Sequence, residues 1–205
     1  MVSAKPIYVL LGKSLNPGRA NVFWWRPLSR QAVLVVDMLK DFIKPGFIPP
    51  ERASETIKAI SRLLKRARAR GVPVVYVCDS HLPDDGEFRL WPRHAVRGTE
   101  GAEVVEELKP QEGDYVVRKR RYSGFYGTDL DLLLRELGVD TVVIVGVATH
   151  ICVLHTAADA YFRGYRVVVP RDCVNAPSDE DNEWGLRYME RMYGALVKGS
   201  EELEI

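Results

Sequence analysis

The chain has 205 residues, which suits one domain with a sizeable core and is short for two full domains. Lys and Arg number 29 and Asp and Glu number 28, so the net charge is only +1, too small to attract nucleic acid or an anionic membrane surface. The three cysteines, Cys78, Cys152 and Cys173, are few, odd in number and far apart, which argues against a disulfide framework and favours a cytoplasmic protein in a reducing compartment.

Residues 1–30 carry few regular signals. Asn16-Pro17-Gly18 indicates a turn, and Phe23-Trp24-Trp25 places three large aromatic side chains next to one another. We expect residues 1–30 to form an N-terminal extension that packs on the core or lies in an oligomer contact, and residues 31–205 to form the main domain.

From Gln31 onward, short strands rich in Val and Ile alternate with helical segments. The predicted strands are Ala32–Val36, Val74–Cys78, Tyr115–Lys119, Thr141–Val145, Arg166–Val169 and Ala195–Val197. The predicted helices are Glu51–Arg70, Ala102–Leu108, Thr128–Leu137 and Asp179–Met192, with one more that begins after Gly146. Because strands without polar alternation are typical of parallel sheets covered on both faces, the sequence predicts an α/β fold, a single-domain, doubly wound and mostly parallel sheet.

Cys152 follows a predicted strand and lies at the start of a helix. The β-branched run Thr141–Val145 indicates a buried strand, and after Gly146 apolar residues recur at helical spacing. Thr149 is a candidate N-cap, which places Cys152 in the first helical turn, where free N–H groups and the helix dipole stabilise a thiolate. Cys152 is therefore a candidate nucleophile, and the alternative is a small residue buried on an inward helix face.

Asp37 ends the first strand. In open α/β sheets ligands bind outside the carboxyl ends of the strands, and no glycine-rich nucleotide-binding signature occurs in the chain. A carboxylate directly after four aliphatic residues is partly buried, which raises its pKa and suits it to take a thiol proton and return it to a leaving group. The alternative is an Asp that caps the following loop.

Polar side chains also follow the second predicted strand. Asp79 and His81 project to the same side of an extended segment, and Glu87 and His94 lie in the next loop. Together they offer nitrogen and oxygen donors suited to a divalent metal. The alternative is a solvated polar loop.

The third strand ends at Lys119, within a run of basic residues. One base of this run is expected to lean inward as a buried cation that holds the negative charges of the site together. Arg118, Arg120 and Arg121 are expected to form a solvated face.

Five motifs occur in order along the chain. They are Val-Val-Asp37-Met-x-x-Asp-Phe42, Asp79-Ser-His81, Trp91-Pro-Arg-His94 with Gly98-Thr99, Lys119-Arg-Arg-Tyr-Ser-Gly-Phe125-Tyr-Gly-Thr128, and Gly146-Val-Ala-Thr-His-Ile-Cys152-Val. On these motifs, the chain from about Ala32 to the C-terminus resembles the isochorismatase-like cysteine hydrolases. Members of that family include nicotinamidases, N-carbamoylsarcosine amidases and ureidoacrylate amidohydrolases.

The resemblance implies a catalytic triad of Asp37, Lys119 and Cys152. It also implies a cis peptide bond between Val147 and Ala148, which makes the N–H groups of Ala148 and Cys152 an oxyanion hole. A six-stranded sheet and a homo-oligomer are further implications of family membership.

The resemblance also implies a small-molecule amide substrate, because the isochorismatase members of the family lack a nucleophile at the position of Cys152. Phe42 and Trp91 stand where nicotinamidases sandwich the pyridine ring, and Val147 is assigned to the substrate site with them. Nicotinamide, hydrolysed to nicotinate and ammonia, is therefore the expected substrate.

Asp79, His81, Glu87 and His94 resemble the metal-binding set of nicotinamidases, so a divalent metal, expected to be zinc, is the implied cofactor. The chain departs from that family pattern in two ways. Ser80 stands where an aromatic residue is often found between the metal-binding Asp and His, and the loop between His81 and His94 is shorter than in many nicotinamidases.

Two other functions fit the same residues. One is an amidase for a carbamoyl or ureido substrate, similar to N-carbamoylsarcosine or ureidoacrylate. The other is a noncatalytic binding protein on the same fold. Much faster labelling of Cys152 than of Cys78 and Cys173 by iodoacetamide would distinguish an enzyme from a binding protein.

Overall fold

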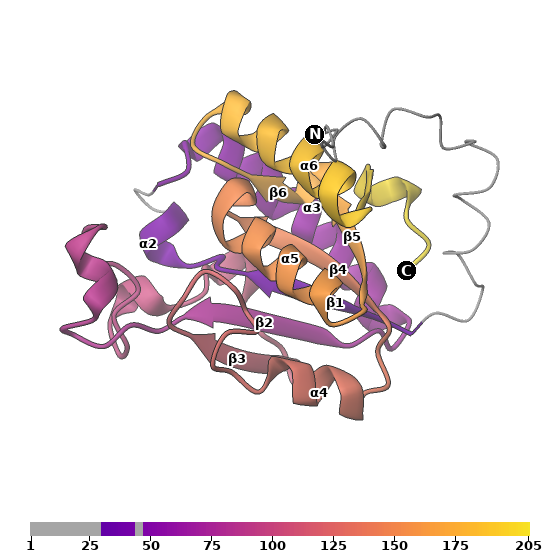
Figure 1. The fold of residues 1–205 in the computed structure, drawn as a ribbon, viewed down its shortest axis with the longest axis horizontal. Coiled ribbons are helices and arrows are strands. Elements are labelled where there is room, and N and C mark those ends of the chain that lie inside the picture. Colours follow the sequence, from indigo (N-terminus) through magenta and orange to yellow (C-terminus); the bar gives the residue numbers. More distant parts are fainter. Residues whose placement is uncertain (1–29, 44–46) are drawn as a thin grey trace, which may run out of the picture.

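The structure is a computed structural model that describes residues 30–43 and 47–205 (Figure 1). All but the last residue of the expected N-terminal extension, including the aromatic residues at 23–25, lies outside the described residues.

Seven described strands form one parallel sheet. Its order is β3-β2-β1-β4-β5-β7, and the short β6 pairs with β4. The strands are β1 Gln31–Val36, β2 Val74–Asp79, β3 Tyr115–Lys119, β4 Thr141–Val147, β5 Arg166–Pro170, β6 Val174–Asn175 and β7 Leu196–Lys198. The predicted α/β fold with a mostly parallel sheet is confirmed, and β6 is the one described strand that the sequence did not indicate.

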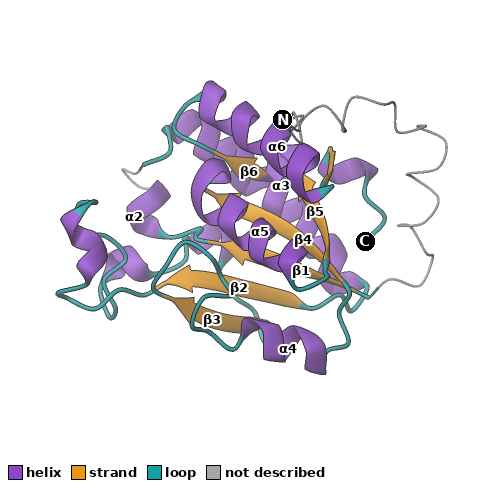
Figure 2. Cartoon of the chain, viewed as in Figure 1, coloured by secondary structure: helices purple, strands orange, loops and turns teal. Residues whose placement is uncertain are grey.

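Helices cover both faces of the sheet (Figures 1 and 2). α3 (Pro50–Ala69) packs on one face, and α4 (Leu130–Glu136), α5 (Leu154–Phe162) and α6 (Asp179–Tyr193) pack on the other. The short α2 (Lys40–Ile43) follows β1 at the carboxyl end of the sheet.

The central strand β1 supplies both cores. Val33 and Val35 belong to the core under α3, whereas Ala32, Leu34 and Val36 belong to the core under the other three helices. Successive side chains of a strand point to opposite faces, so a strand covered on both sides must be apolar at every position. This explains why β1 shows no polar alternation.

The segment expected as a helix over Ala102–Leu108 is not one. It contains two 3-10 turns, Glu100–Ala102 and Glu106–Leu108, with extended backbone between them. In that extended part the N–H of Val105 donates to the carbonyl of Met38 at 3.0 Å. Pairing with the chain that follows β1 therefore satisfies backbone groups that a helix would otherwise have satisfied internally.

The three cysteines are free and buried, which confirms that there is no disulfide framework. Burial raises the pKa of both Cys78 and Cys173 to about 12, so these two are unreactive core thiols. Among the described residues, no helix is both long and apolar enough to cross a membrane.

The strand order reverses between β1 and β4. The chain runs outward from β1 through β2 to β3 and then returns to β4 on the other side of β1. In open parallel sheets, ligands bind in the crevice outside the carboxyl ends of the two strands where the order reverses. Asp37 follows β1 and Cys152 follows β4, so the topology brings both to this crevice.

Candidate active site

Asp37 leaves β1 in a backbone conformation that residues with a side chain rarely adopt. Its φ is 52°, in the left-handed region, and its side chain is buried. Its N–H donates to the carbonyl of Val77 at 3.0 Å, and its Oδ1 accepts the N–H of Asp79 at 2.7 Å. These bonds to β2 and its end hold the carboxylate in one place.

Gly146 lets the strand that leads to Cys152 lie close against β1. Gly146 pairs with Val36, and its φ is 113°. A Cβ atom at this position would lie 1.9 Å from the carbonyl oxygen of Val36, so the close approach requires glycine.

Lys119, at the end of β3, lies at the centre of the site. Its Nζ is 2.7 Å from Asp37 Oδ2, 2.6 Å from Asp79 Oδ1 and 3.6 Å from Cys152 Sγ. Asp37 Oδ2 is within ion-pair distance of Lys119 but makes no well-directed hydrogen bond with a described residue, which leaves it open to a proton. The structure thus brings together the three residues expected as a triad and adds Asp79 to them.

Burial determines the resting protonation states. Burial and the nearby charge of Asp79 raise the pKa of Asp37 to about 6 despite the ion pair with Lys119. Burial also raises the pKa of the Cys152 thiol well above its usual value, against the effect of Lys119. The prediction of a thiolate stabilised by the helix N-terminus is therefore wrong for the resting site, where a thiol lies beside a carboxylate that is able to take its proton.

Thr149 is not an N-cap. After β4 the chain makes a π-helical turn, Thr149–Val153, before α5 begins, and Ala148 occupies the cap position. Thr149 Oγ1 hydrogen-bonds instead with Asn182 Oδ1 of α6 at 2.6 Å. Cys152 still lies in the first helical turn after the strand, and π-helical turns are frequent at functional sites.

The peptide bond between Val147 and Ala148 is cis, as the family resemblance implied. Val147, Ala148, Ile151 and Cys152 all line one cavity. The residues expected to bind substrate and to form the oxyanion hole on this segment therefore lie at the same cavity as the candidate nucleophile.

Asp79, His81 and His94 form a second cluster beside the first. Each offers a ligand atom, and these atoms lie within 4.8 Å of one another. Glu87 does not belong to this group, although its Oε1 lies 4.0 Å from His81 Nε2. Three of the four expected metal ligands are thus brought together, and Glu87 lies beside them.

The cluster fits a divalent metal. His81 is fully buried, yet neither ring nitrogen makes a well-directed hydrogen bond with any residue in the described ranges. Its Nε2 lies 3.6 Å from Asp79 Oδ2, close to the spacing of about 3.4 Å between two ligands that each bind a tetrahedral ion at about 2.1 Å. The Nδ1 of His94 lies 2.7 Å from the carbonyl of Pro92, which favours an N–H there and leaves Nε2 as a ligand.

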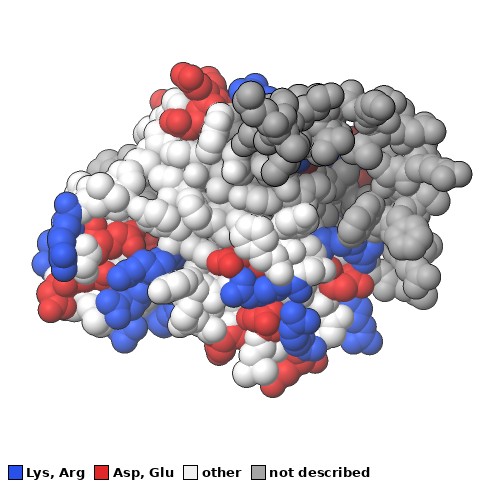
Figure 3. All heavy atoms as spheres, in the orientation of Figure 1, with Lys and Arg blue, Asp and Glu red and all other residues white. Residues whose placement is uncertain are grey.

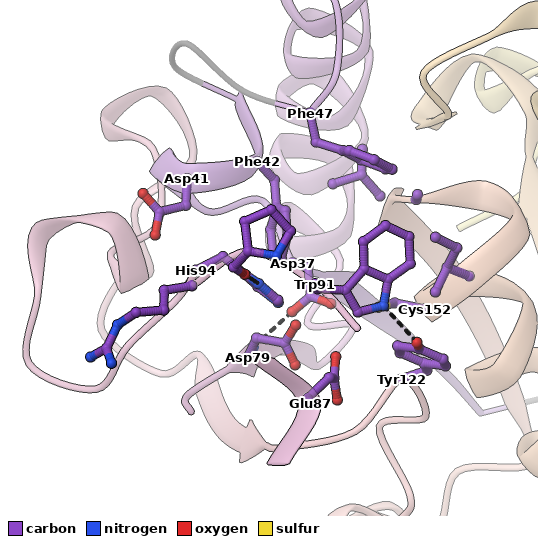
Figure 4. Close-up of a pocket in the computed structure, with 15 residues that line it drawn as sticks. Asp37, Asp41, Phe42, Phe47, Asp79, Glu87, Trp91, His94, Tyr122 and Cys152 are labelled. Atoms are coloured by element: carbon purple, nitrogen blue, oxygen red, sulfur yellow. Dashed lines mark hydrogen bonds between the residues drawn. The ribbon is translucent and has the colours of Figure 1, made fainter. Parts of the chain in front are cut away.

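Aromatic side chains surround the cavity, whose volume is about 320 Å³ (Figure 4). Phe42, Phe47, Trp91 and Tyr122 line it together with His94. The Trp91 Nε1–H donates to the Tyr122 hydroxyl at 2.8 Å, and the Phe47 and Trp91 rings meet edge-on with centroids 6.2 Å apart. The two expected ring-binding residues, Phe42 and Trp91, therefore both lie at the cavity.

Three residues of this region had no assigned role in the sequence analysis. Phe47 and Tyr122 line the cavity, and the buried Asp85 lies against His81. Tyr122 belongs to the motif that begins at Lys119, which was the available signal. A lone Phe and one Asp of a polar loop carry no comparable signal.

The basic run at the end of β3 is only partly a solvated face. Arg118 is exposed, as expected. The side chains of Arg120 and Arg121 are 44% and 45% exposed, and both form ion pairs with the buried Asp85, at 2.8 and 3.1 Å. These two arginines therefore hold the carboxylate of Asp85 in place.

Comparison with known proteins points to one family. The family model for the isochorismatase domain matches residues 31–201. The solved structure of N-carbamoylsarcosine amidase from Thermoplasma acidophilum is 47% identical in sequence, with a TM-score of 0.80 over 86% of this chain and 99% of that one.

Two further solved structures are of a nicotinamidase and a pyrazinamidase. Nicotinamidase PncA from Bacillus subtilis is 35% identical, with a TM-score of 0.77 over 82% of this chain and 99% of that one. Pyrazinamidase of Pyrococcus horikoshii, solved in complex with zinc, is 36% identical, with a TM-score of 0.77 over 83% of this chain and 99% of that one. The chain therefore belongs to the isochorismatase family, as an amidohydrolase that acts on C–N amide bonds.

Proposed function

We propose that this protein is a cysteine amidohydrolase that converts nicotinamide to nicotinate and ammonia through a thioester on Cys152. The observation that carries the proposal is the composition of the cavity wall. Four aromatic residues, candidate metal ligands and Cys152 all line one space of about 320 Å³, which suits a small flat amide.

The aromatic residues would position the ring. Phe42 and Trp91, which both line the cavity, would sandwich it, and the hydrogen bond from Trp91 to Tyr122 would keep the indole in one orientation. A ring held in this way presents its carboxamide to Cys152 repeatedly in the same geometry, which replaces random encounter.

Asp79, His81 and His94 would hold a divalent ion, which we propose to be zinc, with Glu87 as a nearer or water-mediated ligand. When bound, such an ion supplies a positive charge and a coordination position for the ring nitrogen of the substrate.

Attack begins with a proton transfer. Asp37 takes the proton of the Cys152 thiol, and the sulfur forms a bond to the carbonyl carbon of the amide. The ammonium of Lys119, 3.6 Å from Sγ, favours the negative charge on sulfur. The N–H groups of Ala148 and Cys152 would receive the developing oxyanion, a type of contact whose loss costs about 2.7 to 4 kcal/mol of barrier.

Release uses the same carboxyl group. As the C–N bond breaks, Asp37 returns its proton to the nitrogen and ammonia leaves. A water then attacks the thioester, Asp37 takes one of its protons, the C–S bond breaks, and that proton returns to Cys152. The cycle ends with the free acid and the resting thiol.

A carbamoyl substrate is the second candidate, because the solved structure with 47% identity is of an N-carbamoylsarcosine amidase. The same two half-reactions would cleave a ureide. Arg93 also lines the cavity and offers a cation to a substrate carboxylate, which nicotinamide lacks.

Ammonia release from a panel of amides tests the choice of substrate. We expect kcat/KM to be highest for nicotinamide, to fall when zinc is removed by a chelator, and to return when zinc is added. N-carbamoylsarcosine and ureidoacrylate are the comparison substrates. A metal-independent enzyme that prefers either of them would reject the nicotinamide assignment and favour the second candidate.

A further inference from the structure

Asp85 is a buried carboxylate outside the substrate cavity and outside the group of candidate ligands. Its side chain is fully buried, although it lies in the polar loop after β2. A buried carboxylate is costly unless charged or hydrogen-bonding partners surround it. The position of Asp85 therefore requires an explanation that the catalytic residues do not supply.

Its partners come from three parts of the chain. Arg120 Nε donates to Oδ2 at 2.8 Å, and Arg121 Nη1 donates to Oδ1 at 3.1 Å. The N–H of Glu87 donates to Oδ1 at 3.2 Å. The fourth neighbour is His81, whose Nδ1 lies 3.3 Å from Oδ2, within ion-pair distance but without a well-directed hydrogen bond.

The two nitrogens of His81 thus face two different carboxylates. Nδ1 faces Asp85, and Nε2 faces Asp79 at 3.6 Å. A neutral imidazole has one N–H and one lone pair, and a carboxylate beside one nitrogen favours the N–H there. The lone pair is then on Nε2, the nitrogen that faces the other candidate ligands.

We propose that Asp85 is a positioning residue for metal binding, which keeps the proton of His81 on Nδ1 so that Nε2 is presented to a divalent ion beside Asp79. The inference rests on the metal site of the proposed function. Arg120 and Arg121 fix the Asp85 carboxylate and neutralise it, so that it orients the imidazole without competing for the ion.

Zinc affinity of the full chain, measured by competition with a chromophoric chelator, tests this inference. Asp85→Asn should bind zinc roughly 10- to 100-fold more weakly than the wild type, the usual effect of removing a carboxylate behind a metal-binding histidine. Asp84→Asn is the matched control, because Asp84 is the exposed neighbour in the same loop, and its zinc affinity should not change. Wild-type affinity in folded Asp85→Asn would overturn the proposal.

The absorption spectrum of the cobalt-loaded protein provides a readout that a general loss of stability would not move. At saturating Co²⁺, Asp85→Asn should shift the visible bands, because His81 binds the ion differently, whereas Asp84→Asn should keep the wild-type bands. Identical spectra for all three proteins would overturn the proposal.

A third variant covers the case in which Asp85→Asn does not fold. Arg120→Gln changes a half-exposed side chain and removes only the 2.8 Å ion pair between Arg120 Nε and Asp85 Oδ2. It should still weaken zinc binding measurably. Wild-type zinc affinity in Arg120→Gln would then overturn the proposal.

If the wild type binds no zinc, the metal site and this inference both fail. A preference for N-carbamoylsarcosine with zinc bound would reject only the nicotinamide assignment.

Discussion

Asp79 belongs to both clusters of the site. Its Oδ1 lies 2.6 Å from Lys119 Nζ, and its Oδ2 lies 3.6 Å from His81 Nε2. Its N–H also donates to Asp37 at 2.7 Å. One buried residue therefore links the carboxylate that would move the proton, the lysine that holds the charges together and the histidine that would bind a metal.

Cys152→Ala should remove turnover, by at least about a thousandfold in kcat, because no other group near Lys119 can form the thioester. The melting temperature should change little, since the substitution removes a single atom. Cys173→Ala is the control, because Cys173 is a buried cysteine of the core under α3 and should keep its turnover. Ammonia-release rates of the two variants test this prediction. A Cys152→Ala variant that keeps most of its activity would contradict the mechanism.

The pH dependence of Cys152 alkylation by iodoacetamide should reveal Asp37 as its proton acceptor. The pKa of Asp37 is raised to about 6 and that of the thiol lies well above its usual value, so between these values the pair shares one proton. The thiolate fraction of a pair that holds one proton does not change with pH. The labelling rate of the metal-free protein should therefore be flat from about pH 7 to 9 and fall about tenfold per unit below about pH 6.

Asp37→Asn removes the group that accepts the thiol proton, so the range in which the labelling rate does not change with pH should disappear. Labelling in that variant should rise about tenfold per pH unit up to about pH 9, as expected for an isolated buried thiol. A wild-type profile that also rises steadily through this range would mean that Asp37 does not share the thiol proton.

Sequence reasoning predicted which of the candidate residues lie together, but not their protonation states. Asp37, Lys119 and Cys152 could be expected at one place because parallel strands expose their carboxyl ends at the same edge of the sheet. The raised pKa of the thiol could not be foreseen, because it arises from burial by segments far away in the chain. The contact of Asp85 with His81 depends on how a polar loop folds back, which no periodicity in the sequence describes.

At the scale of the elements, the approach of β4 to β1 determines whether the site forms. Gly146 and Val36 are direct neighbours in the sheet, and Asp37 comes immediately after Val36. Any side chain at position 146 would push apart the two strands that lead to the candidate catalytic residues Asp37 and Cys152.

Gly146→Ala should destabilise the protein by about 3 kcal/mol or more, because the new Cβ would meet a backbone oxygen at 1.9 Å and the φ of 113° is itself unfavourable for alanine. Gly113→Ala is the matched control, since Gly113 has a φ of 90° but no atom of the described residues within 4 Å of the added Cβ, and it should cost only about 1 kcal/mol. Urea unfolding of both variants provides the comparison. Equal losses would show that the close strand contact is not required.

The elements that the sequence predicted well are those with a strong local pattern. β1, β2, β4 and α3 combine length with unbroken apolar or amphipathic spacing, so local propensity and burial agree. β6 has two residues, too few for any period to show. The helix predicted around Val105 was wrong because this segment pairs with residues after β1, a contact that its own sequence does not encode.

At the scale of the whole molecule, α5 and α6 present an exposed aromatic face. It comprises Tyr161, Phe162, Trp184, Tyr188 and Tyr193, whose rings contact one another in a chain. In Figure 3 the surface in front of α5 carries few charged side chains, whereas many crowd the side of β3 and α4. Apolar patches of this extent usually mark a contact with another protein, and the homo-oligomer implied by the family resemblance would provide one.

We expect the aromatic face to lie between subunits, so Phe162→Glu should lower the mass of the particle in solution. Phe162 is 70% exposed in the single chain, and a carboxylate there would have to be buried unpaired in a subunit contact. Leu132→Glu is the matched control, because Leu132 is 60% exposed on α4, away from this face, and its substitution should leave the mass unchanged. Light scattering at several protein concentrations measures both variants. A monomeric wild type, or a Phe162→Glu variant with the wild-type mass, would show that the aromatic face is not the subunit contact.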